Sequence, residues 1–135
     1  MKKWLCMLVC CLSVYVQAQV WTLKEKEPAA PGTWWCFRNT VTLEELPRSL
    51  KLRLAADTKY WLWVNGELQV SEGGLKRGPN PSDTYCDVIT SLPALRAGEN
   101  TVALLVWYFG KDGFSHRNSP TAGISFSLFC DGKEV

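Results

Sequence analysis

The stretch YWLWVNG, residues 60–66, decides the fold class. Its first five residues alternate between two faces, as a β-strand requires, because successive side chains of a strand point to opposite sides of the sheet. One face holds Tyr60, Leu62 and Val64, and the other holds Trp61 and Trp63. Asn65 and Gly66 follow at once, and both tolerate the positive φ angles of a tight hairpin turn. The stretch therefore predicts a half-buried strand that leads into a hairpin.

The same alternation recurs on both sides of this stretch. LKLRL (50–54) and ISFSLFC (124–130) each place apolar residues at every second position. The residues predicted to face inward are Leu50, Leu52, Leu54, Ile124, Phe126, Leu128 and Cys130. TVALLVWYF (101–109) is apolar on both faces, which predicts a central strand that is covered on both sides.

Turn residues separate these segments, and helical patterns are almost missing from the sequence. Gly73–Gly74 and GPNPSD (78–83) mark turns. Only SLPALRAG (91–98) favours a helix, of one or two turns, because Pro93 suits a first helical turn and Gly98 suits an end. We therefore expect an all-β fold, an antiparallel β-sandwich of the jelly-roll, galactose-binding-like type.

The first eighteen residues have the pattern of a secretory signal peptide. Lys2 and Lys3 precede an apolar stretch at 4–16, and Ala18 offers a cleavage point. The apolar stretch is too short to span a bilayer. We expect a secreted or periplasmic protein, with residues 19–33 as a linker and 34–135 as the domain. A lipoprotein anchored at Cys10 or Cys11 is less favoured, because neither cysteine follows Gly, Ala or Ser.

The expected mature chain is electrically neutral. The full sequence has 15 basic and 13 acidic residues, and the leader removes Lys2 and Lys3, which leaves 13 of each. No basic stripe indicates a nucleic-acid partner, and no second apolar segment indicates a membrane span.

Three cysteines remain after the leader: Cys36, Cys86 and Cys130. Their spacing is not that of metal ligands, and we expect neither a metal nor another cofactor. One disulfide with one free thiol is open in an oxidising compartment. Burial of all three as small hydrophobic side chains on strands is favoured.

Asp131–Gly132 predicts another hairpin, but the sequence stops at Val135. A strand that should pair with 124–130 would then be missing, which predicts an unpaired sheet edge. We expect a domain incomplete at its C-terminus, a fragment of a longer protein.

Four segments in order resemble a known family. FRNTVTL (37–43), LRLAADTKYWLWVNGE (52–67), YCDVITSL (85–92) and GENTVALLVWYF (98–109) resemble the N-terminal β-sandwich domain of bacterial α-L-rhamnosidases. A related arrangement occurs in the sugar-binding jelly-roll domain of β-galactosidases. The resemblance covers roughly Trp34 to Val135.

The resemblance implies a glycoside hydrolase parent whose reaction is carried by carboxylates on a separate (α/α) barrel. Glycoside hydrolysis usually needs two carboxylic acids that flank the scissile bond. No residue here matches the family's catalytic motif, so no catalytic residue is assigned and the chain alone is not expected to act as an enzyme. Cys86 departs from the family pattern, which more often has an aromatic residue there. Asp87, Thr90 and Asn100 are expected to hold turns rather than to do chemistry.

The loop GKDGFSHRN (110–118) contains the single histidine of the chain, His116. Asp112 is close enough in sequence to pair with it as a general acid–base couple. A surface loop that meets a partner is favoured, because loops carry much of the binding function of proteins. Lys111 and Phe114 belong to the same candidate docking or sugar-binding loop, and Phe114 has no local reason to be there.

Trp61 and Trp63 share one face of their strand, and Trp107 lies on a predicted neighbouring strand. Aromatic rings can stack on the apolar faces of sugars, which makes these residues candidates for carbohydrate binding. Burial in an inter-sheet or interdomain core is favoured for all three. Arg77, in the Gly- and Pro-rich loop, is a further candidate for contact with a sugar hydroxyl or a carboxylate.

Two functions follow. The favoured one is a non-catalytic accessory domain of an α-L-rhamnosidase-like glycoside hydrolase, with a rhamnose-containing glycan or the parent's catalytic domain as partner. The alternative is a stand-alone secreted carbohydrate-binding module.

Overall fold

The computed structural model describes residues 29–75, 86–114, 116–118 and 122–135. The predicted signal peptide, most of the predicted linker and Arg77 lie outside these residues. The strands are β1 (Thr33–Leu43), β2 (Leu50–Asp57), β3 (Lys59–Val64), β4 (Glu67–Gly74), β5 (Asp87–Ile89), β6 (Gly98–Tyr108), β7 (Gly123–Cys130) and β8 (Lys133–Glu134). No helix occurs among the described residues, and so none there could cross a membrane.

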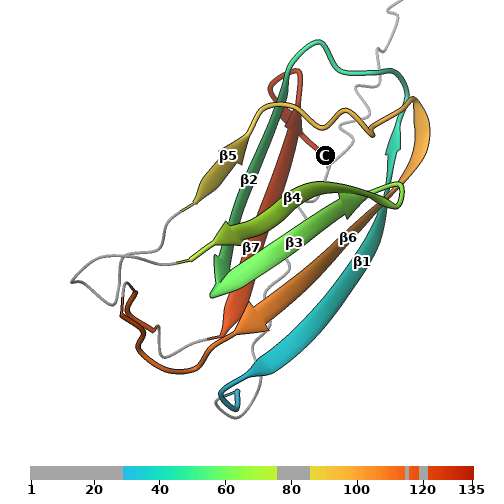
Figure 1. Ribbon diagram of the computed structural model, residues 1–135. Helices are drawn as coiled ribbons and strands as arrows, with labels where there is room; N and C mark the ends of the chain where they lie inside the picture. The colour runs from blue at the N-terminus through green and yellow to red at the C-terminus, as the bar shows by residue number, and fades with distance from the viewer. Residues whose placement is uncertain (1–28, 76–85, 115, 119–121) are drawn as a thin grey trace, which may run out of the picture.

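The strands form two antiparallel sheets that face one another, which confirms the predicted β-sandwich (Figure 1). One sheet has the order β1-β6-β3-β4, and the other has the order β5-β2-β7-β8. The core between them consists of the inward-facing apolar side chains of the alternating strands. Its most deeply buried members are Tyr60, Leu62 and Val64 from β3, Leu52 and Leu54 from β2, Leu104 and Val106 from β6, and Leu128 from β7.

Both predicted hairpins are present. Asn65 and Gly66 join β3 to β4 with φ angles of 51° and 85°, the pair of positive values that the tight primed turn requires. Asp131 and Gly132 join β7 to β8 with φ angles of 50° and 78°.

Buried polar side chains tie distant turns together. Asn100 is 0% exposed, and its side-chain oxygen accepts hydrogen bonds from Asn65 Nδ2 at 2.8 Å and from the Arg96 backbone N–H at 2.9 Å. Its Nδ2 donates to the carbonyl oxygens of Arg96 at 2.7 Å and Gly98 at 3.0 Å. Asn100 therefore holds the turn before β6 against the β3–β4 hairpin, as a scaffold residue.

A second group of polar hydrogen bonds joins the two sheets at Asp87. Its carboxylate accepts from the Tyr60 hydroxyl at 2.7 Å and from the Gly74 backbone N–H at 2.8 Å. Gly73 lies so close to the Tyr60 ring that an added Cβ would sit 2.3 Å from it. Because Gly73 has no side chain, the Tyr60 ring has room to lie there, and its hydroxyl reaches Asp87 at the start of β5.

The helix expected at 91–98 is wrong. Residues there form a turn in which the Leu95 N–H donates to the Leu92 carbonyl at 3.0 Å, and both leucines are buried. The segment crosses from one sheet to the other within a few residues, so burial of these two side chains decides its path instead of helix propensity.

Two expectations about burial are also wrong. Cys36 and Cys86 are exposed, Cys130 is half-buried, and all three are free. β6 is central within its sheet, between β1 and β3, but its second face is not covered by another sheet in the described part of the chain. Ala103, Leu105 and Trp107 on that face are half-buried only.

The strand predicted to be without a partner is paired on one side along its whole length. β7 pairs with β2 from Gly123 to Cys130, and β8 covers Phe129 and Cys130 on the opposite edge. Along 123–128, that opposite edge faces no strand of the described residues. The unpaired edge is therefore shorter than expected.

Candidate functional site

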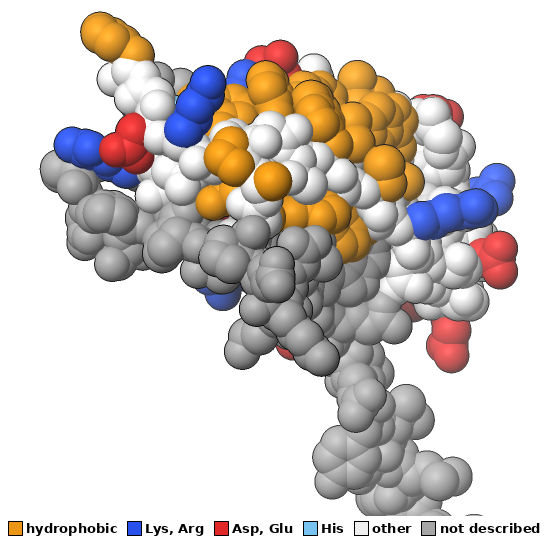
Figure 2. Space-filling view, turned by 90° about the horizontal axis from the view of Figure 1, so that it is seen from below, with side chains coloured by type: hydrophobic (Ala, Val, Ile, Leu, Met, Phe, Trp, Pro, Cys, Tyr) orange, Lys and Arg blue, Asp and Glu red, His pale blue; other side chains and the backbone are white. Residues whose placement is uncertain are grey.

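The outer face of the sheet β1-β6-β3-β4 carries a group of tryptophans. Register brings Trp34 of β1 opposite Trp107 of β6, and Trp61 of β3 opposite Leu105 of β6. We call Trp34, Trp61, Trp63 and Trp107 the aromatic face. Figure 2 views the end of the sandwich where β6 ends and β1 begins, and there hydrophobic side chains gather into a patch with charged side chains at its margin.

The rings of the aromatic face stack on one another. Trp34 lies parallel to Trp107, with centroids 4.8 Å apart and planes 7° apart. The same Trp34 ring stacks on Trp61 at 5.6 Å. Trp107 then meets Phe109 edge-on at 4.4 Å. Trp34 is nevertheless 48% exposed, so this cluster lies on the surface and not between the two sheets. Burial of Trp61, Trp63 and Trp107 in an inter-sheet core is therefore wrong, while their burial in an interdomain core stays a prediction.

Next to the stacked rings the face is hollowed. Cys36, Arg38, Trp63, Ala103 and Leu105 line a shallow depression of about 360 Å³. The surface of this depression is almost entirely apolar, and Arg38 is the only charged residue that lines it. The exposed Leu68 of β4 lies opposite Trp63 and extends the apolar surface.

The loop after β6 packs its histidine against this cluster. His116 is 8% exposed, and its ring meets Phe109 edge-on at 5.1 Å. The Gly113 N–H donates to the His116 carbonyl at 3.1 Å, and a Cβ on Gly113 would lie 2.4 Å from the imidazole. Gly113 thus makes room for the ring.

Asp112 does not orient His116. Its carboxylate accepts from Arg117 Nη1 at 2.8 Å and from the Asn118 backbone N–H at 2.9 Å. These bonds, first the one from the Asn118 backbone and then the one from Arg117, hold the pKa of Asp112 below its ordinary value. The acid–base couple considered from the sequence is therefore not formed, and Asp112 instead closes its own loop.

The remaining candidates in this loop point outward. Lys111 is exposed, and Phe114 is completely exposed. Among the described residues, no group of three or more His, Cys, Asp or Glu side chains is placed to hold a metal ion.

Two buried polar atoms near the aromatic face have no hydrogen-bond partner. They are Trp107 Nε1 and His116 Nε2. Buried polar groups in proteins are nearly always satisfied, so these two atoms are exceptions among the described residues.

Sequence reasoning missed Trp34 and Phe109 as members of the cluster. The alternation of TWWCF at 33–37 could have placed Trp34 on the outer side of its strand. Its contact with Trp107 depends on the β1–β6 register, which local pattern does not reveal.

Comparison with known proteins identifies relatives through structure. No family model matches the chain, and no curated protein matches it in sequence. A GH78 family rhamnosidase of Bacillus sp. GL1 matches 86% of the chain at 29% identity with a TM-score of 0.73. The Streptomyces avermitilis α-L-rhamnosidase, solved with L-rhamnose, matches 86% at 25% identity with a TM-score of 0.57.

An α-L-rhamnosidase from Aspergillus terreus shares the fold over 90% of the chain, with a TM-score of 0.59 and 17% identity. The chain spans 12%, 11% and 15% of the lengths of these three enzymes. The resemblance indicated by the sequence motifs is confirmed: this chain is a β-sandwich similar to one small part of the GH78 α-L-rhamnosidases.

Proposed function

We propose that the chain is a non-catalytic accessory domain of an α-L-rhamnosidase-like glycoside hydrolase, exported from the cytoplasm, and that its aromatic face docks against another part of that enzyme. The observation that carries the proposal is the match to only about an eighth of the GH78 enzyme from Bacillus sp. GL1, 12% of its length. A small sandwich inside a large enzyme has neighbouring domains to contact.

The aromatic face has the composition of an interface. Tryptophans and other large aromatic side chains dominate the energetics of protein contacts, because they bury much apolar area with few rotatable bonds. Here four tryptophans, Leu105 and the exposed Leu68 share one sheet face. The completely exposed Phe114, on the loop next to this cluster, is a second anchor for the same partner.

The stacking of the rings favours protein docking over a sugar platform. A sugar needs an open aromatic ring face on which its C–H groups can lie. Trp34 already lies flat against Trp107 and also stacks on Trp61, so it covers ring faces that a sugar would use. The hollow beside Trp63 is apolar and offers few groups for sugar hydroxyls.

The test is a chimera in which this chain, without its predicted leader, replaces the matching segment of the Bacillus sp. GL1 rhamnosidase. We expect a soluble enzyme that hydrolyses an aryl α-L-rhamnoside, whereas the chain alone gives no turnover. Trp61→Ser combined with Trp107→Ser should lower the thermal midpoint of the chimera by more than that of the isolated chain. Val88→Ser is the matched control, because Val88 is an exposed apolar residue of β5 in the other sheet.

An insoluble or inactive chimera would contradict the accessory role. A chimera in which the double tryptophan variant and Val88→Ser behave alike would contradict the docking role of the aromatic face. Turnover by the isolated chain that is lost in His116→Ala would restore a catalytic function for the loop.

A further inference from the structure

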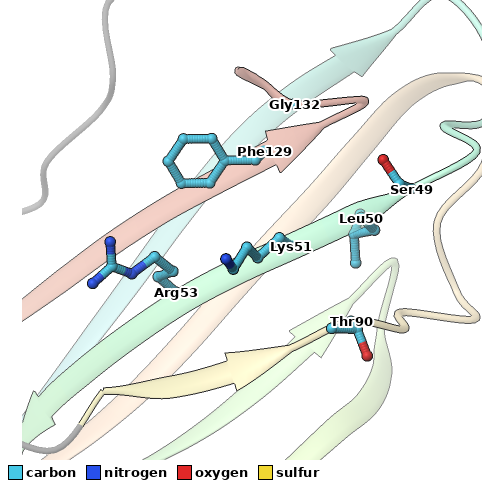
Figure 3. Close-up of a pocket in the computed structure, with 7 residues that line it drawn as sticks. All are labelled: Ser49, Leu50, Lys51, Arg53, Thr90, Phe129 and Gly132. Atoms are coloured by element: carbon cyan, nitrogen blue, oxygen red, sulfur yellow. The ribbon is translucent and has the colours of Figure 1, made fainter.

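The outer face of the opposite sheet contains a hollow that the proposed docking does not use. Its volume is about 440 Å³, within the range of about 300–1,000 Å³ typical of small-molecule sites. Its lining includes Ser49, Lys51, Arg53, Thr90, Phe129 and Gly132. We call it the cationic hollow (Figure 3).

Two cations stand side by side in this hollow. Lys51 and Arg53 are two positions apart on β2, so their side chains leave the same face roughly 7 Å apart at the backbone. Figure 3 shows both extending to the same side of the sheet as Phe129. Both are exposed, and neither makes an ion pair or hydrogen bond with any described residue. Two free cations on neighbouring positions of a rigid strand are suited to hold one carboxylate.

One aromatic side chain, Phe129, which we call the aromatic wall of the hollow, lies next to these cations. Phe129 of β7 lies directly opposite Lys51, and Ser127 lies opposite Arg53. Thr90 closes the other side, because it follows Ile89, which pairs with Leu52. Thr90, the Lys51 cation and the Phe129 ring thus lie in one row across the sheet.

The acids near the hollow are directed elsewhere. Asp131 accepts from the Ser49 N–H at 2.8 Å and from the Arg48 N–H at 3.3 Å. These contacts, first the one from the Ser49 backbone, hold the pKa of Asp131 below its ordinary value. Glu134 lies opposite Phe129, on the far side of that residue from Lys51, and makes no ion pair with the two cations. The charge of Lys51 and Arg53 is therefore left for a ligand.

We propose that the cationic hollow binds the uronic-acid unit of an acidic carbohydrate. Lys51 and Arg53 hold the carboxylate, the Phe129 ring lies against the apolar C–H face of the pyranose, and the Thr90 hydroxyl bonds a sugar hydroxyl. The choice of a sugar over another anion rests on the proposed function, since the relatives act on glycans. The site itself rests on the hollow, the free cations and the aromatic wall.

The experiment titrates the full-length chain, labelled with ¹⁵N, with methyl β-D-glucuronide and follows amide shifts. Methyl β-D-glucoside, sodium acetate, sodium sulfate and AMP serve as comparison ligands. We expect saturable binding of the glucuronide with shifts centred on β2 and β7. Lys51→Ala combined with Arg53→Ala should weaken it at least about ten-fold, since two charge-assisted bonds are lost. Phe129→Ala should weaken it several-fold.

Arg38→Ala is the matched control, because Arg38 is an exposed cation on the outer face of the other sheet. It should leave glucuronide affinity unchanged. Raising the salt from 20 to 300 mM should weaken binding to the wild-type chain but should have little effect on the double variant.

Each other outcome overturns the proposal. Absence of saturable binding removes the site. Equal binding of the neutral glucoside removes the role of the cations, and equal binding of acetate or sulfate removes the role of Phe129. Tighter binding of AMP than of the glucuronide assigns the hollow to nucleotides. These results leave the chimera test untouched, because that test depends on the aromatic face and on no residue of the cationic hollow.

Discussion

Asn100 and Tyr60 show how single buried polar side chains fix this sandwich. Each is 0% exposed, and each bonds a segment distant in sequence: Asn100 reaches Asn65 in the β3–β4 hairpin, and Tyr60 reaches Asp87 at the start of β5. Both positions belong to the sequence motifs that suggested the rhamnosidase resemblance. The motifs are therefore explained by the architecture of the turns and need no catalytic role.

Asn100→Ala should lower the free energy of unfolding by about 2–4 kcal/mol, because the Arg96 and Gly98 carbonyls and the Arg96 N–H lose their partner in a partly buried place. Urea denaturation followed by far-ultraviolet circular dichroism measures the change. Ser125→Ala is the control, since Ser125 is exposed, and it should shift stability by less than about 0.5 kcal/mol. Equal effects of the two substitutions would contradict a structural role for the Asn100 amide.

Tyr60 should make the protein sensitive to alkali. Burial and then the hydrogen bond to Asp87 raise the pKa of Tyr60 far above its ordinary value. In the unfolded chain this hydroxyl loses its proton above about pH 10, while the folded protein keeps it. The folded state then binds more protons, so stability falls as pH rises, by about 1.4 kcal/mol per pH unit. No such contribution acts below pH 9.

Tyr60→Phe removes this titration. The variant should be less stable than the wild type at pH 7, by about 1–2 kcal/mol, because Asp87 loses a donor. The difference between the two proteins should shrink as pH rises from 9.5 to 11.5 in urea denaturation experiments. Two curves that stay parallel over this range would show that Tyr60 is not the group responsible.

At the scale of elements, the edge strands of the sheets differ in length and in how far their outer edges are paired. β1 is an 11-residue edge strand, and β7 is covered on its second edge only from Leu128 to Cys130. Exposed strand edges are templates for pairing with another chain, and outward charges on the edge oppose it. β7 carries Ser125 and Ser127 in its outward positions, with no charge of its own in the strand.

We expect the isolated chain to associate through the edge of β7 as its concentration rises. Ser125→Lys places a charge on this edge and should shift sedimentation velocity profiles toward the monomer. Thr40→Lys places the same charge in an exposed position of β1, the longest edge strand of the other sheet. If Thr40→Lys rather than Ser125→Lys restores the monomer, β1 is the associating edge. A wild-type chain that stays monomeric at all concentrations would contradict both.

At the scale of the whole molecule, alternation in the sequence is enough to predict the sandwich and its core. The inward sets of β2, β3 and β7 are buried as expected, because each strand faces a core on one side only, except that Leu50 and Cys130 at the strand ends are half-buried. Trp61, Trp63 and Trp107 are candidates from the sequence, but the stacking of Trp34 on Trp107 could not be predicted, since it depends on which strands become neighbours and on their register. The cationic hollow escaped for the same reason. In the sequence Lys51 and Arg53 have the pattern of ordinary solvated residues, and only the pairing of β2 with β7 places Phe129 beside them.

The reaction rate of the Cys36 thiol can be used to measure whether the aromatic face is covered in a larger enzyme. It is an exposed free thiol on the outer side of β1, opposite Leu105, and it lines the hollow beside Trp63. Cys86 is also exposed and free, but it lies just before β5 of the other sheet. Variants that retain only one of these two cysteines therefore report on two different faces of the same sandwich.

In the isolated chain, both thiols should react quickly with a thiol-specific reagent such as Ellman's reagent. In the rhamnosidase chimera, Cys36 should become at least about ten-fold slower, because a docked neighbour excludes the reagent from an interface that is packed like a protein interior. The Cys86 rate should stay within a factor of about two. Trp61→Ser combined with Trp107→Ser should restore fast labelling of Cys36, since both rings belong to the proposed docking surface. If Cys36 reacts equally fast in the chain and in an active chimera, the aromatic face stays open to solvent and docking must use another surface.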